Sequence, residues 1–145
     1  MKKLKPIMIV SLFALCGCSG NVPDLGVNNG KLTVCPDSPN CVSSQAEDEA
    51  HYIAPISFDG TLKEAKTRLL EILKGETRIK ILVNRDDYIR AEFTSAVFRF
   101  VDDVEFYLSE QKTANTVIDV RSASRIGHSD LGANKKRIER IRSQF

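Results

Sequence analysis

The sequence predicts an α+β fold, with a small antiparallel sheet of about five strands and two helices packed on one face of it. Two segments, at about 62–74 and 130–143, repeat apolar residues at helical spacing. Between them, from residue 78 onward, apolar and polar residues alternate with a period of two, as strands with one buried face do. The order strand, helix, four strands, helix indicates an antiparallel sheet with both helices covering one face.

The first helix is marked at both ends. Thr61 and Glu64 have the spacing of a capping box, in which each side chain accepts a hydrogen bond from the other residue's backbone N–H, and Gly75 ends the apolar run. A short strand at 53–58 precedes the helix. We assign the apolar stripe to the core rather than to a cofactor site, and its members are Leu62, Ala65, Leu69, Ile72 and Leu73.

The later strands follow from the alternating pattern, and we expect them near 78–84, 87–94, 97–108 and 116–125. The last two form a hairpin around the polar stretch 109–115. Pairing Leu108 with Thr116 sets Phe106 opposite Ile118, so that the apolar faces of both strands agree. The final helix has a basic surface. That surface is either a solvated face, with cations favoured near the helix C-terminus, or a surface attracted to anionic head groups.

The first 17 residues have the parts of a bacterial lipoprotein signal peptide. Three lysines precede a short apolar run at 7–15, which is too short to span a bilayer comfortably. The sequence Leu-Cys-Gly-Cys at 15–18 then matches a lipobox, with an apolar residue at −3, a small residue at −1 and the acceptor Cys18 at +1. We expect cleavage before Cys18 and acylation of Cys18; the alternative is an ordinary secretory signal with incidental cysteines. Ser19 favours the outer membrane, with the domain facing the periplasm.

The charge of the chain gives no support for a nucleic-acid partner. The formal net charge is +2, but the 21 basic side chains include the three lysines of the signal. After cleavage 18 basic side chains remain against 19 acids. We therefore expect no nucleic-acid binding, and a membrane partner through the lipid on Cys18.

A Gly- and Asn-rich segment follows the expected cleavage site. We expect residues 18–31 to be the acylated cysteine and a flexible tether, and residues 32–145 to be a single domain. Thirteen extended residues reach roughly 40–45 Å. The tether would therefore let the domain stand well away from the membrane.

Two cysteines remain in the mature chain, and a disulfide between Cys35 and Cys41 is the leading interpretation in an oxidising compartment. A bridge over this seven-residue loop would contribute about 2.4 kcal/mol in the chain-entropy model. The alternative is a metal site that uses both thiolates and His51. It lacks an evident fourth ligand. We therefore predict no metal and no cofactor apart from the covalent lipid.

Acidic and basic residues converge on the last hairpin. In the expected register Asp103 faces Arg121, and Asp102 faces Ser122 on the apolar side of the sheet, where a carboxylate needs a partner. The same register sets Glu105 against Asp119, a like-charge pair that is unfavourable. We predict one connected network beside the start of the last helix, made of Asp102, Asp103, Glu105, Arg121 and Arg125.

The loop before the last helix extends this candidate site. Ser129 or Asp130 can cap the helix, while Asn134 and Arg137 lie on its first turns. Backbone N–H groups at a helix N-terminus, with arginines nearby, can hold an anion. The cluster is therefore either a structural ion network or a site for an anionic ligand or an envelope protein.

Three long motifs carry a family resemblance: CPDSPNCVSS at 35–44, RFVDDVEF at 99–106 and RSASRIGHSDLGAN at 121–134, followed by Arg137 and Ile138. Over residues 32 to 143 the chain resembles the domain-of-unknown-function family numbered 1499. The resemblance implies a bacterial envelope protein. It brings no established activity and no catalytic residues.

Two classes of function remain open. The first is a membrane-anchored binding or scaffold module, which the signal peptide, the tether and the charged sheet favour. The second is an envelope hydrolase that uses the carboxylates Asp102, Asp103 or Glu105 for acid–base chemistry. The adjacent residues His128, Ser129 and Asp130 cannot form a triad, because triad side chains converge in space.

Overall fold

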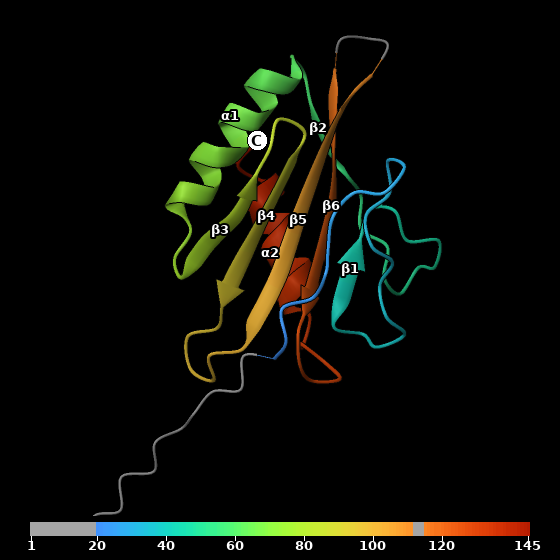
Figure 1. Ribbon diagram of the computed structural model, residues 1–145, viewed down its shortest axis with the longest axis vertical. Coiled ribbons are helices and arrows are strands. Elements are labelled where there is room, and N and C mark those ends of the chain that lie inside the picture. The colour runs from blue at the N-terminus through green and yellow to red at the C-terminus, as the bar shows by residue number, and fades with distance from the viewer. Residues whose placement is uncertain (1–19, 112–114) are drawn as a thin grey trace, which may run out of the picture.

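The computed structural model describes residues 20–111 and 115–145. The signal peptide, Cys18 and Ser19 lie outside the described residues. In the described part of the chain, the fold is α+β, with six strands in one antiparallel sheet and two helices (Figure 1). The strands are β1 (Cys41–Ser43), β2 (Ile56–Phe58), β3 (Ile79–Asn84), β4 (Tyr88–Thr94), β5 (Val101–Glu110) and β6 (Thr116–Ser124).

The sheet has the order β1-β6-β5-β4-β3, and β2 pairs with β6 beyond the end of β1. The fold class is the expected one, and the sheet has one strand more than expected. The additional strand, β1, is three residues long, which is too short to show an alternating pattern. The expected strand at 53–58 is confined to β2.

Both helices cover the same face of the sheet (Figure 1). Helix α1 (Leu62–Gly75) begins with the expected capping box: Thr61 Oγ1 accepts from the N–H of Glu64, whose carboxylate accepts from the N–H of Thr61. Helix α2 (Ala133–Arg142) begins three residues later than expected. The reason is that Leu131 and Gly132 have left-handed backbone conformations, with φ of 54° and 76°, which a right-handed helix cannot continue.

The hydrophobic core lies between this face and the helices. It combines the apolar stripe of α1, with Leu69 and Leu73 fully buried, and alternate residues of the central strands. From α2 it takes Ile138 and Ile141. None of the helices in the described ranges combines the length and hydrophobicity that crossing a bilayer requires.

The register of the β5–β6 hairpin differs by two residues from the expected one. Leu108 pairs with Ile118 rather than with Thr116, and Glu105 pairs with Arg121 rather than with Asp119. A shift of two leaves every side chain on its expected face, so the alternating pattern alone could not distinguish the two registers. The observed register replaces the unfavourable Glu105–Asp119 contact by an ion pair.

The N-terminal segment, residues 20–34, lies across the face of the sheet opposite the helices (Figure 1). Its backbone is fastened by Gln45, whose side chain donates to the carbonyl of Gly30 (3.1 Å) and accepts from the N–H of Leu32 (2.8 Å). Leu32 is buried. This placement differs from the flexible tether expected over residues 18–31, because the described part of that segment packs on the sheet.

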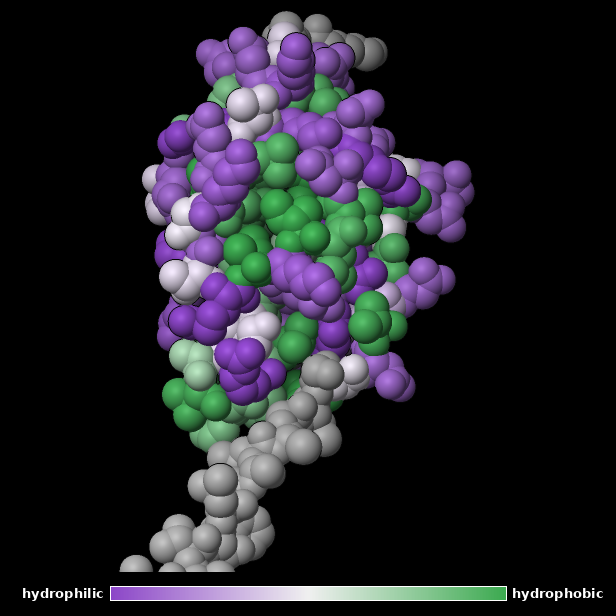
Figure 2. Space-filling view, turned by 60° about the vertical axis from the view of Figure 1, so that its left-hand side comes forward, coloured by the Kyte–Doolittle hydropathy of each residue, from purple (hydrophilic) through white to green (hydrophobic). Residues whose placement is uncertain are grey.

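Figure 2 shows a broad apolar patch across the middle of the visible face and a smaller apolar patch at the lower end of the molecule. The loop between β4 and β5 is at this end, and it exposes Val97, Phe98 and Phe100. The loop between β6 and α2 follows β6, the strand that pairs with β5, and it exposes Leu131. A backbone hydrogen bond from Arg125 to Val101 (3.0 Å) ties the bases of the two loops together.

Candidate functional site

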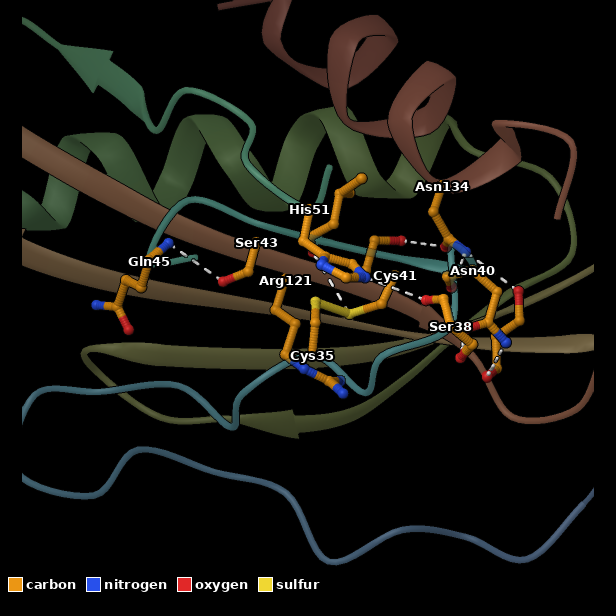
Figure 3. Close-up of a disulfide and its surroundings, with 12 residues drawn as sticks. Cys35, Ser38, Asn40, Cys41, Ser43, Gln45, His51, Arg121 and Asn134 are labelled. Atoms are coloured by element: carbon orange, nitrogen blue, oxygen red, sulfur yellow. Dashed lines mark hydrogen bonds between the residues drawn. A yellow bond between two sulfur atoms is a disulfide. The ribbon is translucent and has the colours of Figure 1, made fainter. Parts of the chain in front are cut away.

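The disulfide between Cys35 and Cys41 closes the loop that leads into β1, as the sequence predicts (Figure 3). Because both sulfurs are in the bridge, neither can act as a thiolate ligand for a metal. His51 is occupied as well: Nδ1 lies 2.7 Å from Asp48 Oδ1, and Nε2 lies 3.2 Å from the carbonyl of Ser38. Within the described residues, no three His, Cys, Asp or Glu side chains gather as a metal-binding group.

Asn40 fixes the disulfide loop to the helix-facing side of the sheet. Its side-chain amide donates to the backbone carbonyl of Gly127 (2.5 Å), and its backbone carbonyl accepts from the side-chain amide of Asn134 (2.9 Å). Asn134 is fully buried and also accepts from the hydroxyl of Ser122 (2.6 Å). One asparagine on α2 therefore joins the disulfide loop to β6.

Asp102 and Arg137 complete this helix-side cluster. Nη2 of Arg137 donates to Asp102 (2.5 Å), and Nη1 donates to Ser122 (3.1 Å) and to Asn134 (2.7 Å). The expectation that Asp102 lies on the apolar side of the sheet and needs a partner is therefore confirmed. The partner is Arg137, from the first turns of α2.

Asp130 occupies the start of α2. Its carboxylate accepts from the N–H groups of Gly132 (2.9 Å) and Asn134 (2.7 Å), while Ser129 accepts only from the N–H of Leu131 (3.3 Å). These are the donors that an anion at this helix end would use. The carboxylate of Asp130 therefore fills the position that sequence analysis offered to an anionic ligand.

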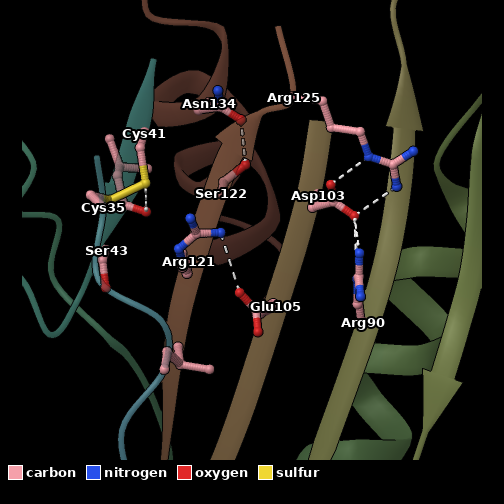
Figure 4. A network of polar contacts seen from close by, with 12 residues as sticks. Cys35, Cys41, Ser43, Arg90, Asp103, Glu105, Arg121, Ser122, Arg125 and Asn134 are labelled. Carbon is pink, nitrogen blue, oxygen red and sulfur yellow. Dashed lines mark hydrogen bonds and ion pairs between the residues drawn. A yellow bond between two sulfur atoms is a disulfide. The ribbon is translucent and has the colours of Figure 1, made fainter. Parts of the chain in front are cut away.

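The opposite face of the sheet carries a second cluster, centred on Asp103 (Figure 4). Arg90 donates to Asp103 at 2.7 and 3.2 Å, and Arg125 donates to it at 2.7 and 2.9 Å. Arg125 also pairs with Glu92. Burial opposes ionisation of Asp103, but the hydrogen bonds and charges of the two arginines outweigh it and lower its pKa. The pairing with Asp103 also raises the pKa of Arg125.

Glu105 forms a third cluster on the same face as Asp103. It accepts from the hydroxyl of Tyr88 (2.7 Å) and from Nη1 of Arg121 (3.3 Å), and all three side chains are buried. Burial raises the pKa of Glu105 even though Tyr88 and Arg121 act in the opposite direction. Burial also lowers the pKa of Arg121, against the opposing charge of Glu105.

The prediction of one connected network is therefore wrong. The five residues divide among three clusters on two faces of the sheet. Asp102 and Asp103 lie on opposite faces because the side chains of neighbouring residues in a strand alternate. Arg121 has no hydrogen bond to Asp103, its expected partner; Arg125 and Arg90 take that place. Arg90, Tyr88 and Glu92 were not predicted as site residues; they fall in the expected strand at 87–94, and nothing else in the sequence singles them out.

A small cavity lies where the N-terminal segment crosses this face. It has a volume of about 160 Å³, and the arginines Arg121 and Arg125 line it together with Asp103 and, from the segment, Asn21 and Pro23. Among the described side chains, Nε of Arg121 is buried without a hydrogen-bond partner. The cavity is far smaller than the 300–1,000 Å³ typical of ligand pockets.

These contacts determine what the site can do chemically. Asp102, Asp103 and Glu105 are each buried and each paired with arginine, so none presents a free carboxylate to the surface. A general acid or base must come within hydrogen-bond reach of its substrate. The clusters have instead the geometry of structural links between β4, β5, β6 and α2.

The fold and these clusters define a class: a small disulfide-bridged α+β domain whose sheet carries buried arginine–carboxylate pairs on both faces. The chain belongs to the family described as "Protein of unknown function (DUF1499)", whose model matches residues 31–145. The matched range includes all six strands and both helices. No curated protein matches the sequence.

Proposed function

We propose that the protein is a membrane-anchored envelope lipoprotein whose α+β domain is a non-catalytic binding or scaffold module. The observation that carries the proposal is the position of Gly20. A Cβ added at Gly20 would lie 3.0 Å from Cβ of Arg125 and from Cγ2 of Ile126, just beyond the end of β6. Cys18 precedes Gly20 by two residues, which span at most about 7 Å.

This geometry supports a close attachment to the membrane. Acyl chains on Cys18 would hold the lower end of the domain beside the bilayer, because the docked segment 20–34 removes most of the reach of a free tether. Two or three acyl chains bind a membrane more firmly than a single chain does. A domain held in one orientation at a surface suits a scaffold or binding role.

The arrangement of the carboxylates supports a non-catalytic role over the hydrolase alternative. The three candidate acids are the buried, arginine-paired residues of the structural clusters described above. In addition, the deepest of them, Glu105, is fully buried, with its oxygens bonded to Tyr88 and Arg121. A hydrolase that used it would have to open the sheet face to its substrate.

The anchor is tested by mass spectrometry of the full chain expressed with its signal in a bacterium. The wild type should be cut before Cys18 and carry acyl chains on it. Cys18→Ala should remain uncut or lose the lipid. Cys16→Ala is the matched control: it should be processed like the wild type, because Cys16 leaves with the signal. An unmodified Cys18 at the mature N-terminus would refute the anchor.

The non-catalytic role is tested by complementation with Glu105→Gln, which keeps the shape of the side chain but removes its charge. We expect this variant to restore the wild-type phenotype to a deletion strain in proportion to the amount of folded protein in the envelope. A variant present at the wild-type amount that fails to complement would favour the hydrolase.

A further inference from the structure

An apolar surface at the lower end of the domain has no partner within the described residues. In the loop between β4 and β5, Val97 is 78% exposed, Phe98 69% and Phe100 44%. The rings of Phe98 and Phe100 stack on each other, with centroids 5.6 Å apart, rather than pack into the core. Leu131, in the adjacent loop, is 87% exposed. Clustered apolar side chains of this kind mark interaction surfaces.

The same end of the domain receives the chain from Cys18. Gly20 lies against Arg125 and Ile126, which begin the loop that carries Leu131. The base of that loop is hydrogen-bonded to Val101, where the aromatic loop ends. The two loops that carry these apolar side chains and the start of the described chain therefore lie at the same end of the domain (Figure 1).

The charges at this end match a phospholipid surface. Arg99 lies between the two phenylalanines and is exposed, and Arg78 and Lys136 line a groove of about 600 Å³ that also reaches Ser95 at the start of the loop. In the two loops, 95–100 and 126–132, the one carboxylate is Asp130, which is committed to the N-terminus of α2. Cations beside exposed aromatic residues favour an interface with anionic head groups.

We propose that the loop from Val97 to Phe100, together with Leu131, inserts into the lipid–water interface of the membrane that holds the lipid anchor. The inference rests on the proposed anchor at Cys18 and deepens it: the acyl chains supply the attachment, and the two loops fix the orientation of the domain. The occupant of this surface is the phospholipid bilayer itself, not a second copy of the chain or another protein.

The absence of tryptophan from the chain allows a direct test. Phe98→Trp places a single tryptophan in the loop and preserves an aromatic side chain. Asp59→Trp is the control; Asp59 is exposed and follows Phe58, which pairs with Thr116 at the other end of β6. Thr116 and Ser124, the two ends of β6, are eight positions apart in an extended strand, which separates them by about 26 Å.

Both variants are expressed as full chains, purified in acylated form and reconstituted into vesicles of phosphatidylethanolamine and phosphatidylglycerol. We expect the tryptophan emission of Phe98→Trp to shift to shorter wavelength and to be quenched by lipids brominated on their acyl chains. The emission of Asp59→Trp should show neither change. Mass spectrometry of the same samples reports the acylation of Cys18.

The outcomes separate this inference from the proposed function. If Cys18 is acylated but the emission of Phe98→Trp behaves like that of Asp59→Trp, the anchor stands and the inserted loop is refuted. If the shift in Phe98→Trp depends on protein density and brominated lipids do not quench the emission, the loops contact a second copy and the inference is also refuted. An unmodified Cys18 overturns the anchor and this inference with it.

Discussion

Glu105 and Arg121 face each other across the β5–β6 ladder, with Nη1 of the arginine 3.3 Å from Oε2 of the carboxylate. Two residues earlier on the same face, Asp103 is held by two arginines at shorter distances. The pKa of Asp103 is consequently lowered, while deeper burial with a single arginine raises the pKa of Glu105. The two acids should therefore respond differently to pH.

Replacing Asp103 should destabilise the fold strongly. Asp103→Asn leaves the buried guanidinium groups of Arg90 and Arg125 without their shared anion, and breaking a buried pair costs about 3–5 kcal/mol. The free energy of unfolding, from denaturant titration at pH 7, measures the loss. Asp59→Asn is the control, since Asp59 is exposed and its change should have little effect. A loss as small as that of the control would show that the cluster is not structural.

The pH dependence of stability should separate the two acids. Asp103 has a lowered pKa in the fold, so its contribution is present above its usual pKa of 3.8 and is lost as the pH falls through the lowered value. Glu105 has a raised pKa, so it keeps its proton to a higher pH in the folded state than in the unfolded state. The contribution of Glu105 therefore decreases as the pH rises from 4.5 through the raised value.

The measurement is the difference in unfolding free energy between the wild type and Glu105→Gln across pH 4 to 8. We expect the advantage of the wild type to shrink with rising pH, by at most about 1.4 kcal/mol per pH unit. A difference that does not change with pH would mean that Glu105 titrates alike in both states.

The sequence predicts well which side chains share a face of the sheet, because the strand period of two is strict. Asp103 and Glu105 lie together, and Asp102 lies on the side of the helices, as expected. The register is less determined, since a shift of two residues preserves every face. The unfavourable contact of Glu105 with Asp119 is the sign in the sequence that the expected register needed such a shift.

The burial of the charged face could not be predicted from the sequence. The segment 20–34 that covers part of it is rich in Gly and Asn and has no apolar periodicity, so its composition indicates a tether. The alternation in the expected strand at 87–94 therefore gives no sign that Arg90 and Tyr88 are buried. Their roles depend on partners in β5 and on a chain segment distant in sequence, which periodicity does not encode.

Arg121→Ala should also destabilise the fold, by about 3–5 kcal/mol, because it leaves the carboxylate of Glu105 buried without its arginine. Adding Glu105→Gln should recover part of this loss, since the neutral amide no longer needs a cation. Denaturant midpoints of the two single variants and the double variant measure this coupling. A stable Arg121→Ala protein that fails to complement a deletion would instead identify a ligand site at the cavity beside Arg121.

The disulfide should contribute about 2.4 kcal/mol, the loop-entropy value for a seven-residue ring. Replacing both Cys35 and Cys41 by Ser should lower the free energy of unfolding by this amount. Dithiothreitol should lower the free energy of unfolding of the wild type to a similar value. It should leave the value of the double variant unchanged, so the double variant is the control for other effects of the reductant. Free thiols in protein taken from the envelope, detected by alkylation without prior reduction, would contradict the bridge.

The N-terminal segment should be released by a single substitution at Gln45. This side chain joins three partners: it donates to the carbonyl of Gly30 (3.1 Å) and to Asp119 (3.1 Å), and it accepts from the N–H of Leu32 (2.8 Å). Gln45→Ala removes all three hydrogen bonds, each worth about 1 kcal/mol net.

The core between the sheet and the helices contains neither Gln45 nor this segment, so we expect the loss of Gln45 to act locally. Hydrogen exchange should become faster in residues 20–34 and should not change in α1 or β4. Glu47→Ala is the matched control, because Glu47 is exposed two residues further along and makes no side-chain hydrogen bond among the described contacts.

In the lipidated protein the freed segment would regain the reach of a tether, so adding Gln45→Ala to Phe98→Trp should reduce the quenching of the tryptophan by brominated lipids. Unchanged exchange in residues 20–34 would show that Gln45 does not hold the segment.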